Sequence, residues 1–474
     1  MTRSRMLFAI VLATFLFTFL LPPDVSTPQT GTPAVTEANL VRTWGTMREK
    51  TYDFPNGDRY WAKRLEAGAN DQPYTFSLFL PGRTGTFRYV RYVDDDPQKP
   101  VWNVINLEET AQLPNAPGFL ETTDRHVWIG APIVYKPLGR GTIEAKQEHV
   151  LPIAVHKQWG GFALEIRMPV QAGLVSEVWA LESSHPLVPW DREQFASVWL
   201  ALDLQRKAKW LYDGYYYQSP STYVPTSPAA YWRIPENYVL RSLLFTGQSR
   251  VAEDMAYVML DASVQNQEAE GYWKTLPRSE WLWQDYGIPD GYYDTRFNTG
   301  AAELMLKGCQ QYREERFCQS VKKYAAFFRD YAARHHFVVD GVNVGWLVAD
   351  YAHPGGNKKT HVSLNHQLAE INFLLNLYLQ EGNPTDRELA EIMLNGVVNL
   401  GAKWVAPNGD LHYARFPDGS FGRTDYPYLT YNDLRETQRL YRAVYGRDEP
   451  VLDQLIRSKR AWMNANGVVN PFPE

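Results

Sequence analysis

Aromatic rings, carboxylates and one guanidinium are crowded into a single segment of the sequence. It contains the runs Trp281-Leu-Trp-Gln-Asp-Tyr286 and Asp290-Gly-Tyr-Tyr-Asp-Thr-Arg296. An arginine can hold a carboxylate or sulfate through two parallel hydrogen bonds, and the flat face of a tryptophan or tyrosine suits a sugar ring. These residue types predict a site for an acidic sugar, with Trp281, Tyr286 and Arg296 as binding residues. The alternative is that the rings pack the segment and Arg296 pairs with Asp290 or Asp294.

A second segment, from residue 337 to residue 361, combines an acid with bases. Asp350 stands shortly after Trp346, and Lys358 and Lys359 follow it. Basic groups beside a cleft attract an acidic glycan, and Trp346 offers another ring on which a sugar can stack. The segment therefore adds to the prediction of an acidic carbohydrate as ligand.

Ser363, Asn365 and His366 stand at the start of the next predicted helix, just after His361. A serine nucleophile needs a histidine base and an acid that orients the histidine. The sequence places no acid beside these residues, so it does not predict such a triad. We interpret both histidines as structural.

Long polar segments of this kind separate predicted helix pairs. Beyond Trp190, apolar residues recur with the 3.6-residue period of a helix, and we expect a lone helix from Arg192 to Trp210. Helix pairs are predicted to begin near residues 232, 298, 362 and 432. Gly382 and Gly446 mark turns, because glycine readily adopts the left-handed conformation that ends a helix.

The three segments at residues 271–297, 337–361 and 405–430 each join an outer helix to the next inner one. They must therefore emerge from the same end of the helical domain and line one shared cleft. Long loops inside a compact domain are usually functional. We predict that residues 190–474 form an incomplete (α/α) toroid of helical hairpins.

Residues 31–189 are predicted to form a β-rich domain, a sandwich or a barrel-like fold. Short runs such as Tyr74 to Leu80 and Phe162 to Met168 are separated by turn residues. The fold class is α+β multidomain. In one loop the run Asp94-Asp95-Asp96 could be a solvated turn or a calcium site; otherwise we expect no metal and no cofactor.

The N-terminus indicates export. Arg3 and Arg5 precede an apolar run at residues 6–21, which predicts that residues 1–30 are a cleaved signal peptide or a retained membrane anchor. We expect an extracytoplasmic protein that is secreted or attached to a membrane by this segment. Export permits a disulfide between Cys309 and Cys318, and a pair of free thiols is the alternative.

Composition limits the partners. The 474 residues carry a formal net charge of −5, which argues against a surface for polyanions over the whole molecule and against nucleic acid as a partner. It still allows a local basic cleft. Aromatic residues make up 14% of the chain, enough for both a protein core and sugar-binding surfaces. We expect an acidic polysaccharide as substrate, and a homodimer is left open.

The third long segment carries a family resemblance. The order of Tyr413-Ala-Arg415, then Asp425-Tyr426, then Asn432-Asp-Leu434 resembles the C-terminal domain of the D-glucuronyl C5-epimerases. In that family a Tyr-x-x-Arg segment, here one residue short, precedes an Asp-Tyr segment and an Asn-x-Leu that opens the last helix. The run from Val362 to Gly382 is similar to the family's Ser-Phe-x-Leu-Asn helix. The resemblance covers about residues 190 to 470.

The resemblance also implies a carboxylate in the loop before that helix, within a Glu-Tyr-Pro segment. Asp350-Tyr351 is the nearest match, with aspartate in place of glutamate and a longer loop rich in glycine and lysine. This departure leaves the role of the carboxylate open.

The chemistry of such an enzyme explains these residue types. Inverting C5 of a glucuronate removes a proton next to a carboxylate and returns one on the opposite face, so an acid and a base must flank the ring. The resemblance implies Tyr413 and Tyr426 as proton-handling residues and Asp350 as base or orienter. Arg296 or Arg415 would neutralise the substrate carboxylate, on which negative charge builds.

Two other functions remain open. A glycoside hydrolase needs two carboxylates at a set separation, and the long segments offer several: Asp285, Asp290, Asp294, Asp350, Asp410 and Asp425. A polysaccharide lyase could use the same fold. A glycan-binding protein of the cell envelope would keep the aromatic cleft and need no catalytic acid. We favour C5-epimerisation, which makes the protein an isomerase.

Overall fold

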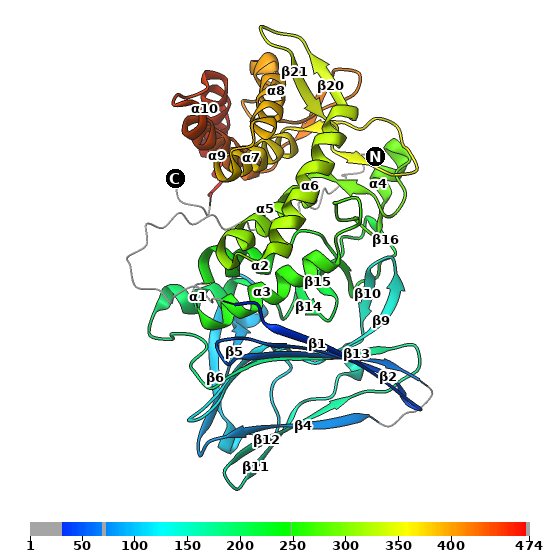
Figure 1. The fold of residues 1–474 in the computed structure, drawn as a ribbon, viewed down its shortest axis with the longest axis vertical. Helices are drawn as coiled ribbons and strands as arrows, with labels where there is room; N and C mark the ends of the chain where they lie inside the picture. The colour runs from blue at the N-terminus through cyan, green and yellow to red at the C-terminus, as the bar shows by residue number, and fades with distance from the viewer. Residues whose placement is uncertain (1–30, 69–72, 248, 471–474) are drawn as a thin grey trace.

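The computed structural model describes residues 31–68, 73–247 and 249–470 (Figure 1). The predicted signal peptide or anchor lies outside these residues. Within the ranges described, no helix combines the length and the apolar character needed to cross a membrane.

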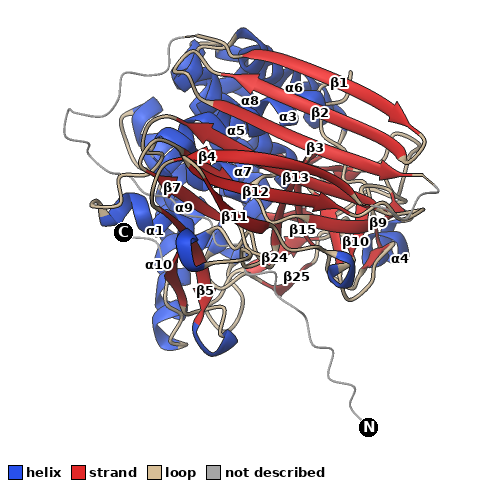
Figure 2. Ribbon diagram, turned by 90° about the horizontal axis from the view of Figure 1, so that it is seen from below, coloured by secondary structure: helices blue, strands red, loops and turns tan. Residues whose placement is uncertain are grey.

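A large antiparallel sheet dominates the N-terminal half. It has 13 strands in the described residues, and its central strand β13 pairs with β3 along one edge and with β8 and β9 along the other. Figure 2 shows β1, β2 and β3 running side by side next to β13. The strands are β1 (Ala34–Arg42), β2 (Gly45–Asp53), β3 (Arg59–Ala67), β5 (Gly85–Tyr92), β6 (Pro100–Asn106), β7 (Gly118–Thr122), β8 (His126–Ile129), β9 (Ile133–Gly139), β10 (Thr142–Ala145), β13 (Val175–Ser183), β14 (Ala208–Leu211), β15 (Gly214–Gln218) and β17 (Ala230–Arg233).

A smaller sheet covers one face of the large sheet and completes a sandwich. It consists of β4 (Tyr74–Pro81), β11 (Ala154–Gln158) and β12 (Gly161–Met168). Along β13, Val178 belongs to the core between the two sheets, whereas the next residue, Trp179, belongs to the core under the helices. Successive side chains of a strand point to opposite faces, so β13 is buried along nearly its whole length.

The large sheet extends beyond residue 189. The helix predicted from Arg192 to Trp210 ends early: α1 spans Glu193–Ala201, and the chain then forms β14, β15 and β17. These strands enter the sheet because β17 pairs with β10. Buried Ala208 and Trp210 alternate with the partly exposed Lys209, which is the period of a strand, so the prediction of a helix is wrong for these residues.

Paired helices form the C-terminal half. Helix α5 contacts α6 and α7, α7 contacts α8 and α9, and α9 contacts α10. The predicted turns at Gly382 and Gly446 are confirmed, since both glycines have positive φ at a helix end. The helices are α2 (Tyr238–Ser242), α3 (Arg250–Gln265), α4 (Glu280–Tyr286), α5 (Thr295–Tyr312), α6 (Glu315–Arg334), α7 (Leu364–Glu381), α8 (Pro384–Leu400), α9 (Leu429–Tyr445) and α10 (Pro450–Ala465).

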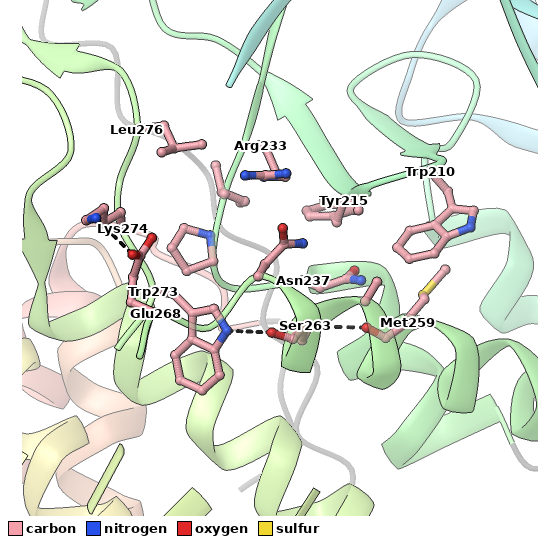
Figure 3. Close-up of a pocket in the computed structure, with 15 residues that line it drawn as sticks. Trp210, Tyr215, Arg233, Asn237, Met259, Ser263, Glu268, Trp273, Lys274 and Leu276 are labelled. Atoms are coloured by element: carbon pink, nitrogen blue, oxygen red, sulfur yellow. Dashed lines mark hydrogen bonds and ion pairs between the residues drawn. The ribbon is translucent and has the colours of Figure 1, made fainter. Parts of the chain in front are cut away.

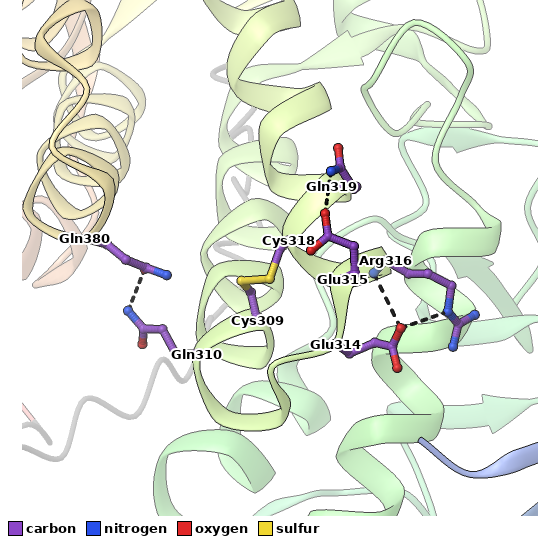
Figure 4. The surroundings of a disulfide bond; sticks show 8 residues. All are labelled: Cys309, Gln310, Glu314, Glu315, Arg316, Cys318, Gln319 and Gln380. Atoms are coloured by element: carbon purple, nitrogen blue, oxygen red, sulfur yellow. Dashed lines mark hydrogen bonds and ion pairs between the residues drawn. A yellow bond between two sulfur atoms is a disulfide. The ribbon is translucent and has the colours of Figure 1, made fainter. Parts of the chain in front are cut away.

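One disulfide joins the second helix pair. Cys309 near the end of α5 is bonded to Cys318 in α6, with 4.9 Å between their Cα atoms (Figure 4). Of the two alternatives that the sequence left open, the structure shows the bridge. It closes the turn between the two helices.

A buried lysine ties the last helix pair to the third long loop. Lys459 in α10 is fully buried, and its Nζ lies 2.5 Å from Asp410 Oδ1 and 2.8 Å from Asp425 Oδ2. Asp425 also accepts a hydrogen bond from Thr430. Burial raises the pKa of Asp425 to about 6, and Lys459 acts in the opposite direction. A charge buried in this way is stable only with its partners in place.

Replacing Lys459 with methionine should therefore destabilise the protein. The variant keeps the apolar stem but leaves Asp410 and Asp425 buried without their cation, and we expect a loss of about 3–5 kcal/mol in the free energy of unfolding. Guanidinium chloride unfolding measures it. Arg439→Ala, which breaks an exposed pair with Glu436, is the control and should cost less than about 1 kcal/mol. Equal losses in the two variants would contradict the argument.

Candidate functional site

The three long loops come together at the start of the inner helices, as predicted. The short strand β19 (Tyr293–Asp294) pairs with β22 (Tyr351–Ala352), which joins the first loop to the second. Likewise β23 (Val362–Ser363) pairs with β24 (His412–Arg415), which joins the second to the third. Strand β25 (Phe421–Thr424) extends this last pair. Because β19 leads directly into α5 and β23 into α7, these pairings hold the helix starts side by side.

Asp350 lies at the centre of this arrangement and is fully buried. Its carboxylate accepts a hydrogen bond from the backbone N–H of Ser363 at 2.8 Å and another from the Ser363 hydroxyl. His361 Nε2 lies 3.3 Å away and His366 Nδ1 3.7 Å away. Tertiary contacts thus supply the acid that the sequence could not place beside the histidines. The serine donates to the aspartate, not to a histidine, so this is not a nucleophilic triad.

Burial favours the neutral forms of both Asp350 and His361. It raises the pKa of Asp350 well above its usual range, opposed by the hydrogen bonds from Ser363. It lowers the pKa of His361 to about 3, and Arg423 adds to that effect. His361 Nδ1 lies 2.8 Å from the hydroxyl of Tyr286. At neutral pH this cluster can therefore hold a proton without carrying a net charge.

His366 occupies a second chain of polar groups. Its Nδ1 lies 2.8 Å from Thr295 Oγ1, and burial lowers its pKa well below the usual range. One turn further along α7, Glu370 is fully buried, which raises the pKa of its carboxyl, and neither of its oxygens has a hydrogen-bond partner among the described residues. The Thr295 hydroxyl can accept from His366 Nδ1–H or donate to a bare Nδ1, and in the first case Nε2 is the unprotonated nitrogen.

Tyr413 and Tyr426 lie together at the half-buried side of the cluster. Their rings meet edge to face with centroids 5.7 Å apart, and the Tyr413 ring lies 6.0 Å from that of His361. Burial raises the pKa of Tyr426 to about 12 and that of Tyr413 well above its usual range. Both phenols therefore keep their protons at neutral pH and can act as acids. These two predicted residues are brought beside Asp350.

The predicted aromatic residues of the first loop also reach the cluster. Tyr286 contacts His361 through its hydroxyl. The Trp281 ring lies 5.7 Å from that of His361 and meets Tyr351 edge to face at 5.8 Å. Trp281 is partly exposed.

The other predicted binding residues have different surroundings. Arg296 donates to both carboxylate oxygens of Asp433, at 2.9 and 3.2 Å, so its charge is already compensated. Arg415 lies over the ring of Phe337 at 5.3 Å. Trp346 stacks on His336 with centroids 3.9 Å apart, in the hairpin of β20 (His336–Val339) and β21 (Gly345–Val348) that packs on α8. The structure does not bring Trp346 together with Asp350.

Arg423 is a cation at the site that the sequence reasoning did not select. Its side chain is 40% exposed, lies over the Trp281 ring at 4.9 Å and pairs with Asp285 at 3.0 Å. Its position two residues before Asp425-Tyr426 was the available signal. An exposed guanidinium beside an aromatic ring can receive the carboxylate of a sugar acid.

The carboxylates that could serve a glycoside hydrolase are mostly occupied. On the surface, Asp285 pairs with Arg423 and Asp290 with Arg140. Asp410 and Asp425 share Lys459. Asp294 and Asp350 are buried. A hydrolase needs two carboxyl groups that flank a bond, and four of these six carboxylates are already paired with cations.

The acidic run at residues 94–96 forms a tight turn after β5. Asp94 and Asp95 have positive φ, and the Asp96 carboxylate accepts the Gln98 N–H at 2.9 Å and pairs with Lys99 at 3.4 Å. Within the part of the chain that the structure describes, no group of three or more histidine, cysteine or acidic side chains is arranged to hold a metal ion.

A small hollow lies between the large sheet and α3 (Figure 3). Around it, Trp273 Nε1 donates to the carbonyl of Ser263 at 2.7 Å and Lys274 pairs with Glu268 at 2.8 Å. Its volume of about 40 Å³ holds a few water molecules. A sugar ring does not fit there.

Comparison with known proteins finds solved structures with low TM-scores. No family model matches the chain. No curated protein matches it in sequence. Among solved structures, a D-mannose isomerase is 14% identical with a TM-score of 0.37, covering 48% of this chain and 59% of that one. A cellobiose 2-epimerase from Spirochaeta thermophila is 14% identical with a TM-score of 0.37, and the match covers 48% of this chain and 57% of that one.

A family 76 glycoside hydrolase from a bovine Bacteroides thetaiotaomicron strain is 10% identical with a TM-score of 0.37, covering 92% of this chain and 78% of that one. The chain spans somewhat more than half the length of the isomerase and the epimerase. All three proteins are carbohydrate-active enzymes, and none is a glucuronyl C5-epimerase. These TM-scores are low, so the function is argued from the residues of this chain.

The pKa of Asp294 gives a test of the buried site. Asp294 caps α5 by accepting the Phe297 N–H, and burial raises its pKa to about 7, against about 3.9 in an unfolded chain. Between pH 4 and 7 the folded carboxyl keeps a proton that the unfolded one loses. The free energy of unfolding should therefore fall as pH rises, by at most about 1.4 kcal/mol per pH unit.

Asp294→Asn preserves the cap but cannot titrate. The stability of the natural protein relative to this variant should decrease from pH 4 to pH 7 in urea unfolding. Asp330→Asn, at an exposed position of α6, controls for the removal of one carboxylate. A constant difference across this range would contradict the burial of an ionisable Asp294.

Proposed function

We propose that this protein is a carbohydrate-active enzyme of the isomerase class that inverts C5 of glucuronate units in an acidic polysaccharide. Its helix pairs form an incomplete (α/α) toroid, and the three loops at one end bind the substrate. The protein acts outside the cytoplasm, which the disulfide between Cys309 and Cys318 supports. No cofactor is invoked.

One observation carries the proposal. Two protonated phenols, Tyr413 and Tyr426, lie half-buried against a cluster in which Asp350, His361 and His366 are buried and neutral. Epimerisation needs a base that is unprotonated before it takes the C5 proton and an acid that can return one. Burial tunes the groups of this cluster toward those protonation states.

The residues divide into three roles. In the tautomer whose Nδ1–H donates to Thr295, His366 Nε2 takes the C5 proton, and the electrons of the C–H bond move into the adjacent carboxylate. Tyr426 or Tyr413 returns a proton to C5 from the opposite face. Asp350 is buried behind these groups and orients Ser363 and His361, so it serves as a positioning residue and does not touch the substrate.

Binding of the sugar acid falls to the partly exposed residues. Arg423 receives the substrate carboxylate in place of Asp285, its partner in an exposed and therefore weak ion pair, and negative charge increases on the substrate carboxylate when the proton leaves. Trp281, beside it, covers a face of the ring. Arg296 is a poorer candidate than the sequence suggested, because Asp433 already occupies both arms of its guanidinium.

Hydrolysis is the second candidate, and no observation favours it, since the available carboxylates are paired or buried. A glycan-binding protein would need an aromatic surface and a cation. It would not need several buried acids and histidines held neutral around two phenols.

The first experiment detects proton exchange. Glucuronate-containing polysaccharides incubated with the protein in deuterated water should take up deuterium at C5, followed by NMR, without chain cleavage. Cleavage would indicate a hydrolase or lyase, and the absence of uptake on every polymer tested would overturn the epimerase proposal.

Variants separate the base from the acid. His366→Gln should abolish both exchange and inversion. Tyr426→Phe should lower inversion by about 10²–10⁴-fold but leave exchange at the original face, because the base can return a deuteron to the same side. Tyr413→Phe is the parallel test for the other phenol. Tyr445→Phe, at the far end of α9, is the matched control.

Replacing Arg423 with glutamine should weaken substrate binding. The loss of one charge-assisted pair costs about 1.5–3 kcal/mol, so KM for the acidic polymer should rise by about tenfold or more. Arg442→Gln, whose exposed side chain pairs with Asp448, should leave KM unchanged. An unchanged KM in Arg423→Gln would remove this residue from the binding site.

A further inference from the structure

A hollow of about 500 Å³ lies in the β-rich half of the molecule, away from the three loops. It opens between the end of β5, the turn from β8 to β9 and the connection from α1 to β14. Its volume is in the range of pockets that bind small ligands. None of the residues that line it belongs to the cluster around Asp350.

Two buried tryptophans form its wall. Trp179 Nε1 donates to the carbonyl of Trp210 at 3.0 Å, and Trp210 Nε1 donates to the hydroxyl of Tyr60 at 2.9 Å. These hydrogen bonds fix both rings before any ligand arrives. A fixed aromatic wall binds a ring without paying the entropy of ordering side chains.

The connection from Leu202 to Lys207 contributes Leu204, Gln205 and Arg206 to the hollow and is held by three hydrogen bonds. Its Asp203 carboxylate accepts from the Tyr92 hydroxyl at 2.9 Å. The carbonyl of Gln205 accepts from Lys209 Nζ at 2.6 Å, and that of Arg206 accepts from the Tyr231 hydroxyl at 2.7 Å. The backbone is therefore fixed while the side chains of Gln205 and Arg206 line the hollow.

Those two side chains present polar atoms that nothing in the described chain satisfies. Gln205 Oε1 and Arg206 Nη1 are buried and have no hydrogen-bond partner among the residues described. Such atoms are uncommon in folded proteins. Gln205 also lines an adjoining small hollow together with Trp102 and Trp199. The indole N–H groups of these two tryptophans are likewise buried and have no hydrogen-bond partner among the residues described.

The unsatisfied atoms define a ligand. Gln205 Oε1 is an acceptor for a hydroxyl, and Arg206 Nη1 is a cationic donor for a carboxylate. The Arg206 guanidinium lies over the Tyr92 ring at 5.1 Å, and both residues line the hollow. A ring with an apolar face, a hydroxyl and a carboxylate matches these groups.

From these contacts we propose a second saccharide-binding site in the β-rich domain, which takes a uronate unit of an acidic glycan and does no chemistry. Asp95 is the one acidic residue among those lining the hollow, and the ammonium of Lys209, which also lines it, donates to the carbonyls of Leu204 and Gln205, so we assign no acid–base pair there. The choice of a uronate rests on the proposed function; the hollow and its unsatisfied atoms do not. The site would hold a polymer while the distant cluster acts on it.

The test is binding of a glucuronate-containing hexasaccharide to the full chain, measured by isothermal titration calorimetry in the His366→Gln background, which prevents turnover. Two binding events per chain are expected. Arg206→Ala should weaken one of them about tenfold or more, and Gln205→Ala should weaken the same one. Arg91→Ala, an exposed arginine on β5, should change neither. A neutral hexasaccharide should bind this second site more weakly than the acidic one, and Arg206→Ala should not weaken its binding further.

A single binding event, or two that are unaffected by both Arg206→Ala and Gln205→Ala, would overturn the site. Melting curves of both variants show whether they are folded, and the milder Gln205→Ala keeps the test valid if Arg206→Ala is not. The outcomes also separate the two proposals. If binding depends on Arg206 but no deuterium exchange occurs, the epimerase proposal is refuted and the second site is supported. If exchange occurs but binding does not depend on Arg206, the second site is refuted and the epimerase proposal is supported.

Discussion

The arrangement of the candidate site depends on the burial of Asp350. Its carboxylate binds the backbone and hydroxyl of Ser363 at the start of α7, and its carbonyl accepts the N–H of Thr295 at the start of α5. Its own N–H donates to the carbonyl of His361. One residue therefore joins two helix starts and the loop between them. Polar groups cut off from water in this way are costly unless satisfied, which makes the geometry specific.

The β-rich half of the chain also holds the first long loop of the site in place. The short strand β16 (Tyr223–Val224) pairs with β18 (Arg278–Ser279) of the first loop, and Arg140 in the β9–β10 turn pairs with Asp290 at 3.0 Å. Gly141 has a φ of +63°, and a Cβ there would lie 2.4 Å from Leu276. This close approach, which needs glycine, places the loop against the end of the large sheet.

Charge is distributed according to depth. The buried acids and histidines are driven toward neutral forms by the loss of water, so protons can be held inside without a net charge. Charged groups such as Arg423 lie at the partly exposed rim. An acidic substrate would meet the cation first and the proton-handling groups behind it, which is the order that abstraction of a proton next to a carboxylate requires.

The sequence by itself determined the helix pairs after residue 232, the turns at Gly382 and Gly446 and the convergence of three loops, because periodicity and glycine turns are local properties. It also indicated Tyr413, Tyr426 and Asp350 by their order along the chain. Only the tertiary structure decided which groups meet. Arg296 pairs with Asp433, His361 and His366 gather around Asp350, and the sheet continues to Arg233. These partners are far apart in the chain, and burial, which sets the proton affinities, follows from the packing of whole elements.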